Sequence, residues 1–358
     1  MGTPPADPST SGAVHELARR ADLLLIGSQS YISPELADMA TRAVELETAE
    51  LEPSSRRTYR YLTRDYERFC DGHGLDAFVS SSVRLYLVDR VEAAEPRATL
   101  RNRINAIRRM AHEAGRPDPT DDPGVRKSLK GAVRAIPIRE PRRVAPATYE
   151  SLQLLVDAIE AMSRESVRPQ LEKQTDAAAM LLRDRALVLL GFALGRRGSE
   201  LARVDLEHIE WRPDGLLIKI PYSKTNKSGE PEVVGVPKFV GDPLCPVAAL
   251  AAWVHYAKVT AGPVFVTLSP LARKRGNRMA ARDISRRLEA IAAKAGLPGI
   301  WRSHSLRRGV VTSAEAAGVA RSRTRLLTGW KSDAMFSVYA DHQDKIAQSP
   351  LHDLYRTR

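Results

Sequence analysis

Apolar residues recur at helical spacing through the first half of the chain. Between residues 57 and 70, Tyr59, Leu62, Tyr66 and Phe69 lie three or four positions apart, with arginines between them. This spacing places the four side chains on one face of an amphipathic helix. The same reasoning predicts further helices at residues 14–26, 34–51, 82–91, 99–114 and 125–136.

The predicted helix at 99–114 separates apolar from basic positions, and Thr99 is a residue type that often caps a helix N-terminus. Its inner face is expected to hold Leu100, Ile104, Ile107 and Met110. Its outer face is expected to hold Arg101, Arg103, Arg108 and Arg109. Such charges can be merely solvated. Because arginine dominates and acids are sparse on these faces, we predict that residues 52–138 form a helical domain that contacts phosphates of a nucleic-acid backbone.

The pattern changes after residue 148, where helices alternate with short strands. Helices are predicted at 149–162, 175–194, 245–260 and 279–295. The helix at 175–194 is very apolar, so we expect it to be central. Strands are predicted at 216–222 and 232–236, joined by a hairpin loop rich in Lys, Asn and Gly, and 264–268 is a short buried segment. The predicted fold class is mainly α with a small antiparallel β-sheet (α+β).

Composition shifts suggest where the domains divide. Residues 1–51 read as an N-terminal extension that is partly disordered, since its first dozen residues are small, polar and proline-rich. Residues 139–147 contain two prolines, which disfavour helix, and are predicted to be a linker whose Arg142 and Arg143 follow a DNA backbone. A second domain covers 148–342, and 343–358 is a tail with one short amphipathic helix.

The net charge favours a polyanionic partner. The 358 residues carry a formal charge of +12 and the pI is about 9.8, which fits nucleic acid. Cys70 and Cys245 lie far apart and form no metal-type cluster, as expected for a reduced cytosolic protein. The N-terminus lacks the pattern of a signal peptide, and the most apolar run, 186–194, is too short to span a bilayer. A cytoplasmic location is therefore predicted, and no association with a membrane is expected.

The stretch from residue 303 to 339 concentrates the candidate chemistry. His304 and Arg307 lie three apart in a helix-compatible run, so both project from one face. An imidazole beside a guanidinium suits an anion such as phosphate. Tyr339 is near enough in sequence to serve as a nucleophile in covalent catalysis.

Four features together resemble the tyrosine recombinase (phage integrase) family over residues 148–342. They are Arg197 in a G-x-R-x-x-E-L stretch, Lys224 on the hairpin, His304-x-x-Arg307, and Trp330 nine residues before Tyr339. Their order and spacing carry the resemblance, since each alone is weak. It implies a site-specific recombinase built as a two-domain clamp on double-stranded DNA, with four protomers on two recombination sites and the tail docking on a neighbouring protomer.

The resemblance also implies a role for each residue. Tyr339 would attack the scissile phosphate and form a 3′-phosphotyrosine, and Lys224 would protonate the leaving 5′ oxygen. Arg197 and Arg307 would clamp the non-bridging oxygens. His304 would bind the phosphate or help to take the tyrosine proton. Trp330 would donate its indole N–H at a position where most members have His. Glu200 would hold a basic residue in place. No metal, nucleotide or other cofactor is implied.

Several alternatives remain open at this point. Arg196 stands where the family usually has an apolar residue, so it competes with Arg197 for the phosphate. Lys227 is a rival for Lys224, and Tyr355 is a weaker rival for Tyr339. A type IB topoisomerase, a telomere resolvase, or a DNA-binding regulator without activity is an alternative function. Neither the target sequence nor the biological role, such as integration, dimer resolution or transposition, follows from the residues.

Overall fold

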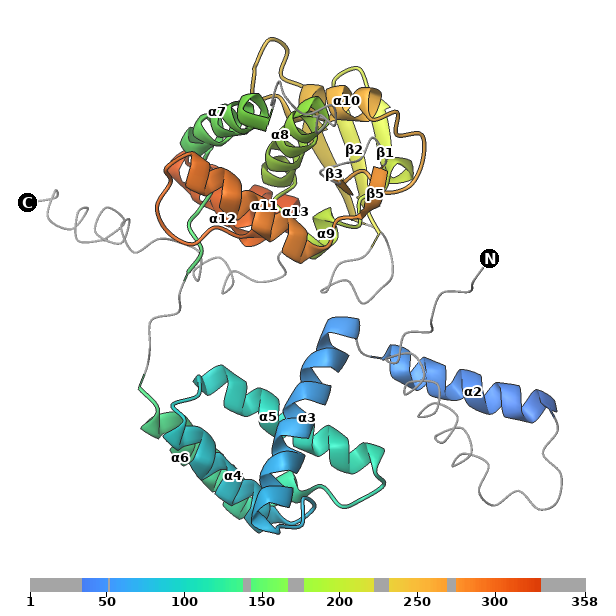
Figure 1. Cartoon of the computed structure of the whole chain (residues 1–358), viewed down its shortest axis with the longest axis vertical. Coiled ribbons are helices and arrows are strands. Elements are labelled where there is room, and N and C mark those ends of the chain that lie inside the picture. Colours follow the sequence, from blue (N-terminus) through green and yellow to red (C-terminus); the bar gives the residue numbers. More distant parts are fainter. Residues whose placement is uncertain are drawn as a thin grey trace, which may run out of the picture. The chain divides into compact units, whose positions relative to one another are not determined.

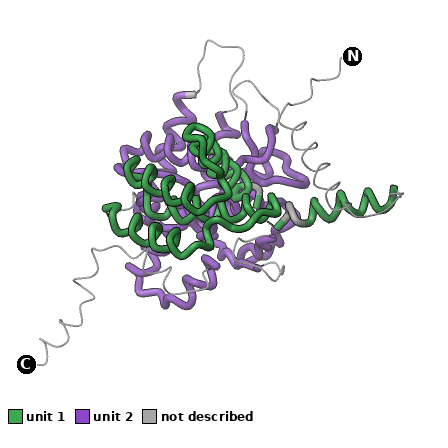
Figure 2. The backbone as a smooth tube through the Cα atoms, turned by 90° about the horizontal axis from the view of Figure 1, so that it is seen from below, with its two compact units in different colours: residues 1–140 green, residues 141–358 purple. Residues whose placement is uncertain are grey.

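The computed structural model describes the chain in six stretches, with two compact units. The described residues are 34–50, 52–137, 143–166, 177–221, 232–268 and 275–329. The units are residues 1–140 and 141–358 (Figure 2). Their boundary lies inside the segment 139–147 that was predicted as a linker. Among the described residues, no helix is both long and apolar enough to cross a membrane.

The first unit is helical throughout its described residues (Figure 1). Its elements are α2 (Pro34–Ala49), α3 (Pro53–His73), α4 (Ser80–Glu92), α5 (Arg97–Glu113), the 3₁₀ turn η1 (Pro119–Asp121) and α6 (Pro123–Ala135). The helices predicted between residues 34 and 136 are confirmed, with ends shifted by up to four residues. The helix predicted at 14–26 lies outside the described residues. Helices α3 to α6 enclose one apolar core, which includes Tyr66, Val83, Leu100 and Ile107.

Local chemistry explains where these helices begin and end. Helix α3 stops at Gly74, whose φ of 62° is a left-handed conformation that glycine adopts without a Cβ penalty. Helix α6 starts after Asp122, whose carboxylate accepts from the Val125 N–H at 3.0 Å. The prediction that Thr99 caps α5 is wrong. The helix begins at Arg97, directly after Pro96, and the Thr99 N–H already bonds to the Pro96 carbonyl at 2.8 Å.

The outer-face position predicted for Arg103 is also wrong. Its side chain is only 4% exposed, in contrast to the exposed Arg101. The guanidinium of Arg103 donates to Glu95 at 2.8 Å and to Asp65 at 2.7 Å. Arg103 follows Leu100 by three residues and precedes Ile107 by four, so it shares their buried face of α5. Arg103 therefore joins helices of this unit and is not available to a DNA backbone.

The second unit surrounds a central helix with further helices and two small sheets. Its helices are α7 (Tyr149–Ser166), α8 (Ala177–Leu194), α9 (Gly198–Leu201), the 3₁₀ turn η2 (Leu206–His208), α10 (Pro246–Tyr256), α11 (Ala281–Lys294), α12 (Ser303–Ala316) and α13 (Arg321–Thr328). Its strands are β1 (Ile209–Arg212), β2 (Gly215–Ile220), β3 (Glu232–Pro237), β4 (Val266–Leu268) and β5 (Arg275–Arg278). The predicted class, mainly α with a small antiparallel sheet, is confirmed.

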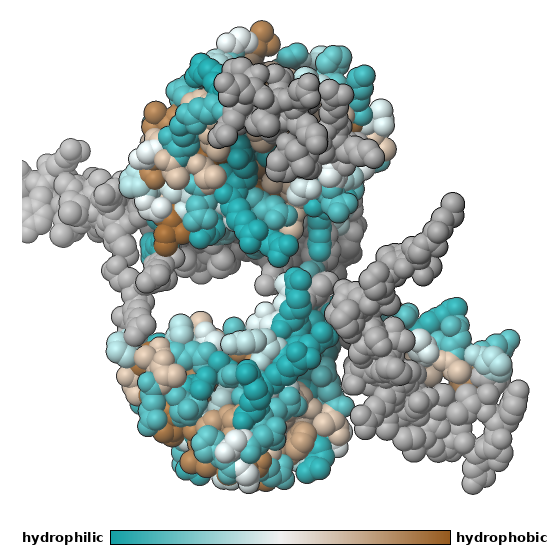
Figure 3. Space-filling view, viewed as in Figure 1, coloured by the Kyte–Doolittle hydropathy of each residue, from teal (hydrophilic) through white to brown (hydrophobic). Residues whose placement is uncertain are grey.

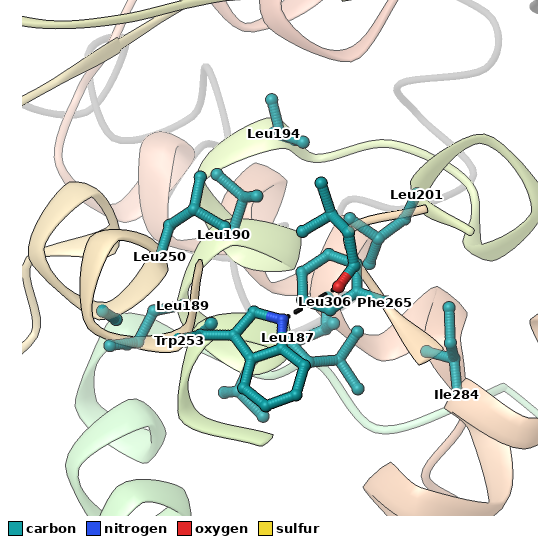
Figure 4. Close-up of a cluster of buried hydrophobic side chains, with 14 of the residues drawn as sticks. Leu187, Leu189, Leu190, Leu194, Leu201, Leu250, Trp253, Phe265, Ile284 and Leu306 are labelled. Carbon is teal, nitrogen blue, oxygen red and sulfur yellow. Dashed lines mark hydrogen bonds between the residues drawn. The ribbon is translucent and has the colours of Figure 1, made fainter. Parts of the chain in front are cut away.

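Helix α8 is the centre of this unit, as its apolar sequence predicts. It packs against α7, α10 and α12, and Leu187 and Leu190 on it are at most 1% exposed. Trp253 of α10 is fully buried beside it, and its indole N–H donates to the Val264 carbonyl at 2.8 Å (Figure 4). Leu306 of α12 completes this part of the core. The core thereby fixes the helix that carries His304 and Arg307.

The sheets are antiparallel and lie in the order β1-β2-β3 and β4-β5. In the first, Ile218 faces Val234 and Leu216 faces Val236, and all four side chains are buried. The predicted strands correspond to β2 and β3, and the short segment at 264–268 contains β4. Strands β1 and β5 were not predicted, because they have four residues each and β1 buries one of them.

Candidate functional site

A turn between α8 and α9 brings two arginines to one end of the central helix. Gly195 has a φ of 57°, and a Cβ there would lie 2.8 Å from Val310. This glycine therefore allows both the left-handed turn and close packing on α12. Arg196 and Arg197 follow directly, and the chain then enters the short helix α9.

Glu200 holds Arg197 in place from the next turn of chain. Its side chain is only 3% exposed. One carboxylate oxygen accepts from the Arg197 backbone N–H at 3.1 Å, and the other accepts from its guanidinium at 2.8 Å. The Arg197 side chain nevertheless stays 26% exposed. Part of the guanidinium is thus oriented by Glu200 while the side chain still reaches the surface.

Arg307 is the most deeply buried cation of the site, with no exposed surface. Its Nη1 donates to the Gly195 carbonyl at 2.9 Å and to the Thr328 carbonyl at 2.7 Å. These two bonds join α12 to the turn after α8 and to the end of α13. The position of Arg307 is therefore set by backbone atoms of two segments that are far apart in the sequence.

His304 lies one helical turn before Arg307 on α12 and is partly buried. Burial, and then the positive charges of Arg307, Arg197 and Arg308, lower the pKa of His304 to about 4. The imidazole is therefore neutral at pH 7 and can accept a proton or a hydrogen bond. The charges of Arg197, Arg307 and Arg308 thus act on His304, and these four residues are called the cationic cluster.

Arg196 and Arg197 have different surroundings, although they are adjacent in the chain. The Arg196 side chain is 2% exposed and forms an ion pair with Glu232, the first residue of β3. Arg197 keeps about a quarter of its side chain exposed. Of the two, Arg197 is the residue with surface to offer an anion.

Three residues that the sequence analysis did not single out contribute to this region. Arg308 is buried and donates to the Val144 carbonyl. Gly309 packs so closely on Ala147 that a Cβ would clash with its backbone. Glu232 is the partner of Arg196. Arg308 and Gly309 could have been suspected because they directly follow Arg307. The partners of these three residues (Val144, Ala147 and Arg196) are more than 30 residues away in the sequence, so only the folded structure identifies them.

Several predicted site residues lie outside the described residues. They are Lys224, Trp330, Tyr339, Arg142 and the alternatives Lys227 and Tyr355. The structure thus brings together Arg197, Glu200, His304 and Arg307. Of the predicted DNA contacts, Arg101 and Arg143 are exposed, and Arg108 is 47% exposed with an ion pair to Asp118 at 3.0 Å.

The cluster of three arginines around a neutral imidazole is a site for a negatively charged group. In the described stretches, no three His, Cys, Asp or Glu side chains gather as metal ligands would. The profile of the phage integrase family matches residues 163–345, which contain every residue of this cluster. The chain belongs to this family. It is a tyrosine recombinase, an enzyme that cleaves and rejoins DNA.

Curated relatives agree with this assignment over most of the chain. The recombinase is 27% identical to an integrase/recombinase XerD homolog of Selenomonas ruminantium over 339 residues, covering 93% of this chain and 94% of the relative. It is 25% identical to the tyrosine recombinase XerC of Chlamydia muridarum over 280 residues, covering 77% of this chain and 76% of the relative.

Solved structures show the same fold at low sequence identity. A XerH site-specific recombinase bound to a palindromic difH substrate has a TM-score of 0.58 and 14% identity, with 96% of this chain and 94% of that chain covered. A lambda integrase dimer bound to a COC′ core site has a TM-score of 0.53 and 17% identity, with 94% and 91% covered.

Proposed function

We propose that this chain is a site-specific DNA recombinase that cleaves each strand through a 3′-phosphotyrosine on Tyr339 and exchanges strands through a Holliday junction. The observation that carries the proposal is the cationic cluster, which includes Arg197, His304 and Arg307. Its charges suit the phosphoryl transition state of the tyrosine recombinase reaction, in which negative charge grows on the non-bridging oxygens.

The proposed reaction forms one bond and breaks one bond at phosphorus. The Tyr339 hydroxyl oxygen attacks, its proton passes to a base, and the bond from phosphorus to the 5′ oxygen breaks. His304 is neutral at pH 7, so it can accept a hydrogen bond from the Tyr339 hydroxyl and help to take its proton, or bind the phosphate, although a pKa of about 4 makes it a weak base. Lys224 protonates the leaving 5′ oxygen. Religation by a 5′-hydroxyl reverses these steps, so no external energy source is required.

Two arginines with fixed positive charge stabilise the transition state in this scheme. Arg197 is oriented by Glu200, and Arg307 is oriented by two backbone carbonyls. Donors held in this way need no reorganisation as the charge develops, and each contributes roughly a hundredfold or more in rate. Trp330 is proposed to add an indole N–H donor to the same phosphate.

We assign DNA-backbone contacts to exposed basic residues of the first unit and the linker. Arg101, Arg108 and Arg143 keep this assignment, as does Arg142. A strip of arginines along α3 strengthens it, and a hydrophilic surface follows this helix (Figure 3). The strip consists of Arg57, Arg60, Arg64 and Arg68, all exposed. Such a row fits the regular spacing of phosphates.

The proposed assembly is a homotetramer on two recombination sites, in the cytoplasm, with residues 343–358 of each protomer docking on a neighbour. The similar solved proteins were crystallised on DNA, one as a dimer on a core site and one on a palindromic substrate. We propose by extension that the target is a short inverted repeat, with one protomer on each half. Inverted repeats in the DNA beside the gene are the first candidates.

A covalent trap tests this function. The purified protein is incubated with nicked duplexes that carry those inverted repeats, because the short released fragment diffuses away and prevents religation. We expect a protein–DNA adduct that survives denaturing electrophoresis. The matched control is Tyr339→Phe, which lacks only the nucleophilic oxygen and should bind the same DNA without forming the adduct.

Each other outcome has a definite meaning. An adduct that persists in Tyr339→Phe removes Tyr339 from its role. Relaxation of any supercoiled plasmid regardless of sequence would indicate a topoisomerase, and hairpin-ended products would indicate a telomere resolvase. Binding by the unmodified protein without any adduct contradicts the proposal and indicates a DNA-binding regulator.

A further inference from the structure

The ion pair between Arg196 and Glu232 lies where three segments of the second unit meet. Arg196 is in the turn after α8, and Glu232 begins β3. The third segment is the end of α13, where Gly329 packs directly on the pair. A Cβ at Gly329 would clash with the Arg196 guanidinium and would lie 2.8 Å from the Glu232 carboxylate. The backbone of Gly329 thus closes over a charged pair.

The pair is adjacent to two backbone carbonyls that accept hydrogen bonds from Arg307. One carbonyl that accepts from Arg307 belongs to Gly195, the residue before Arg196. The other belongs to Thr328, the residue before Gly329. Arg197, the exposed arginine of the site, is the residue after Arg196. A shift of the ion pair would therefore move both carbonyls that orient Arg307 and the backbone that carries Arg197.

We propose that Arg196 and Glu232 form a positioning pair for the phosphate-binding arginines of the proposed reaction. Arg196 does not contact the phosphate; it acts through the backbone on Arg197 and Arg307. This inference rests on the proposed function, because it assigns Arg196 a part in the same DNA cleavage. It also gives a reason for a charged residue at a position where the family usually has an apolar one.

The burial of the pair explains why it would act as a unit. The Arg196 side chain is 2% exposed and that of Glu232 is 29% exposed. Removing Glu232 leaves an unmatched charge on the almost fully buried Arg196, which costs more than the pair contributes. Removing Arg196 leaves the partly exposed Glu232 without the guanidinium that holds β3 against the turn after α8. Replacing both by apolar side chains of similar size removes the unmatched charge and lets the three segments stay packed. A direct phosphate ligand has no such dependence on its partner.

A double-mutant cycle distinguishes the two roles. Single-turnover cleavage is measured at saturating protein on a nicked duplex that the unmodified enzyme cleaves, with Arg196→Met, Glu232→Leu and the double variant. We expect each single change to slow cleavage roughly a hundredfold, the size of effect that a small misplacement produces. The double variant should recover to within about tenfold of the unmodified rate.

The result that overturns the proposal is equally definite. If Glu232→Leu cleaves normally and the double variant is as slow as Arg196→Met, then Arg196 itself touches the phosphate. Should a variant fail to fold, as judged by circular dichroism, the milder Arg196→Lys and Glu232→Gln replace it. Arg196→Lys retains the charge for Glu232 and should lose less activity than Arg196→Met. Equal loss in both would contradict a pairing role.

A neutral substrate provides a second readout that a purely structural effect would not move. In a methylphosphonate duplex, a methyl group replaces one non-bridging oxygen, so the charge that a clamping arginine must neutralise is absent. The deficits of Arg197→Ala and of Arg196→Met should both shrink on this substrate, because Arg196 acts through the same clamping arginines. A deficit of Arg196→Met that stays unchanged while that of Arg197→Ala shrinks would overturn the inference. Absence of cleavage of the ordinary duplex by the unmodified enzyme would instead refute the proposed function.

Discussion

Each unit of the molecule contains a buried arginine, and the two arginines have opposite surroundings. In the first unit, Arg103 donates to the carboxylates of Glu95 and Asp65 and to the Tyr86 hydroxyl. In the second unit, Arg307 donates to the carbonyls of Gly195 and Thr328. Both side chains are at most 4% exposed.

The charges around the two residues differ in sign. Burial acts to raise the pKa of Asp65, but the Tyr86 hydroxyl and the charges of Arg103 and Arg90 outweigh it, so this pKa is lowered. In the second unit, the charges that lower the pKa of His304 are those of Arg307, Arg197 and Arg308, which are all positive. The first cluster balances its own charge. The second has positive charge to offer to a phosphate.

The comparison teaches how to separate a structural arginine from a catalytic one. Burial does not separate them, and neither does the residue type. What separates them is whether neighbouring carboxylates balance the positive charge, because a guanidinium that is fully bonded to carboxylates has no donor left for a ligand. The predictions below test this distinction in order of decreasing expected effect.

Replacing Arg103 by Met should destabilise the first unit most, by about 3 kcal/mol, because the largely buried Glu95 would lose this ion-pair partner. Asp65 would keep only Arg68 and Arg90 as ion-pair partners among the described residues. Chemical denaturation followed by circular dichroism measures this loss of helix. The four tryptophans of the chain are at 211, 253, 301 and 330, all in the second unit. Tryptophan fluorescence should therefore show an unchanged transition.

Arg101→Ala is the matched control on the same helix, because Arg101 is exposed. Its effect on the free energy of unfolding should stay within about 0.5 kcal/mol. If Arg103→Met were equally mild, the charge-balanced cluster would not be the structural element that the comparison describes.

Replacing Arg197 by Ala should have the converse effect, a large loss of rate with little loss of stability. Cleavage of a bound nicked duplex should slow by about 10²–10³-fold, because one preorganised donor to the transition state is removed. DNA affinity should change far less in a mobility-shift assay. Arg212→Ala is a suitable control, since Arg212 is exposed on β1 and pairs with Glu210. Normal cleavage by Arg197→Ala would exclude it from the proposed site.

The pH dependence of stability should differ between the two clusters. The unfolded chain binds a proton on His304 near pH 6.5, whereas in the folded protein its pKa is lowered to about 4. The unfolded state thus binds more protons in this window, so stability is full above pH 6.5 and falls between pH 6.5 and 4. The loss is on the order of 3 kcal/mol.

Tryptophan fluorescence during urea unfolding at several pH values measures this effect in the second unit. His304→Gln, which cannot titrate, should flatten the curve between pH 6.5 and 4. Asp65 has a lowered pKa, so its contribution to the first unit should persist through this window and be lost only in more acid solution. An unchanged slope in His304→Gln would mean that its folded pKa is close to the ordinary value.

Apolar periodicity by itself determined most of the helices and their order. It placed the central helix α8 correctly, because a segment this rich in apolar residues has to be buried on most of its surface. The resemblance to the tyrosine recombinases predicted that Arg197, Glu200, His304 and Arg307 would gather, and the structure brings these four together. Strands β1 and β5 escaped prediction because four residues are too few to show a period.

Tertiary structure alone decided which of the many arginines are free to act. The sequence placed Arg103 with Arg101 on an outer face, although its spacing from Leu100 and Ile107 already indicated the inner one. The three-residue offset to Glu200 favoured Arg197 over Arg196. The surroundings of Arg196, however, depend on Glu232, which approaches from a strand more than 30 residues away. All arginine side chains carry the same guanidinium group, and they differ only in the residues that the fold places beside them. Long-range packing sets that difference, since it determines whether each charge meets a carboxylate, a carbonyl or the surface.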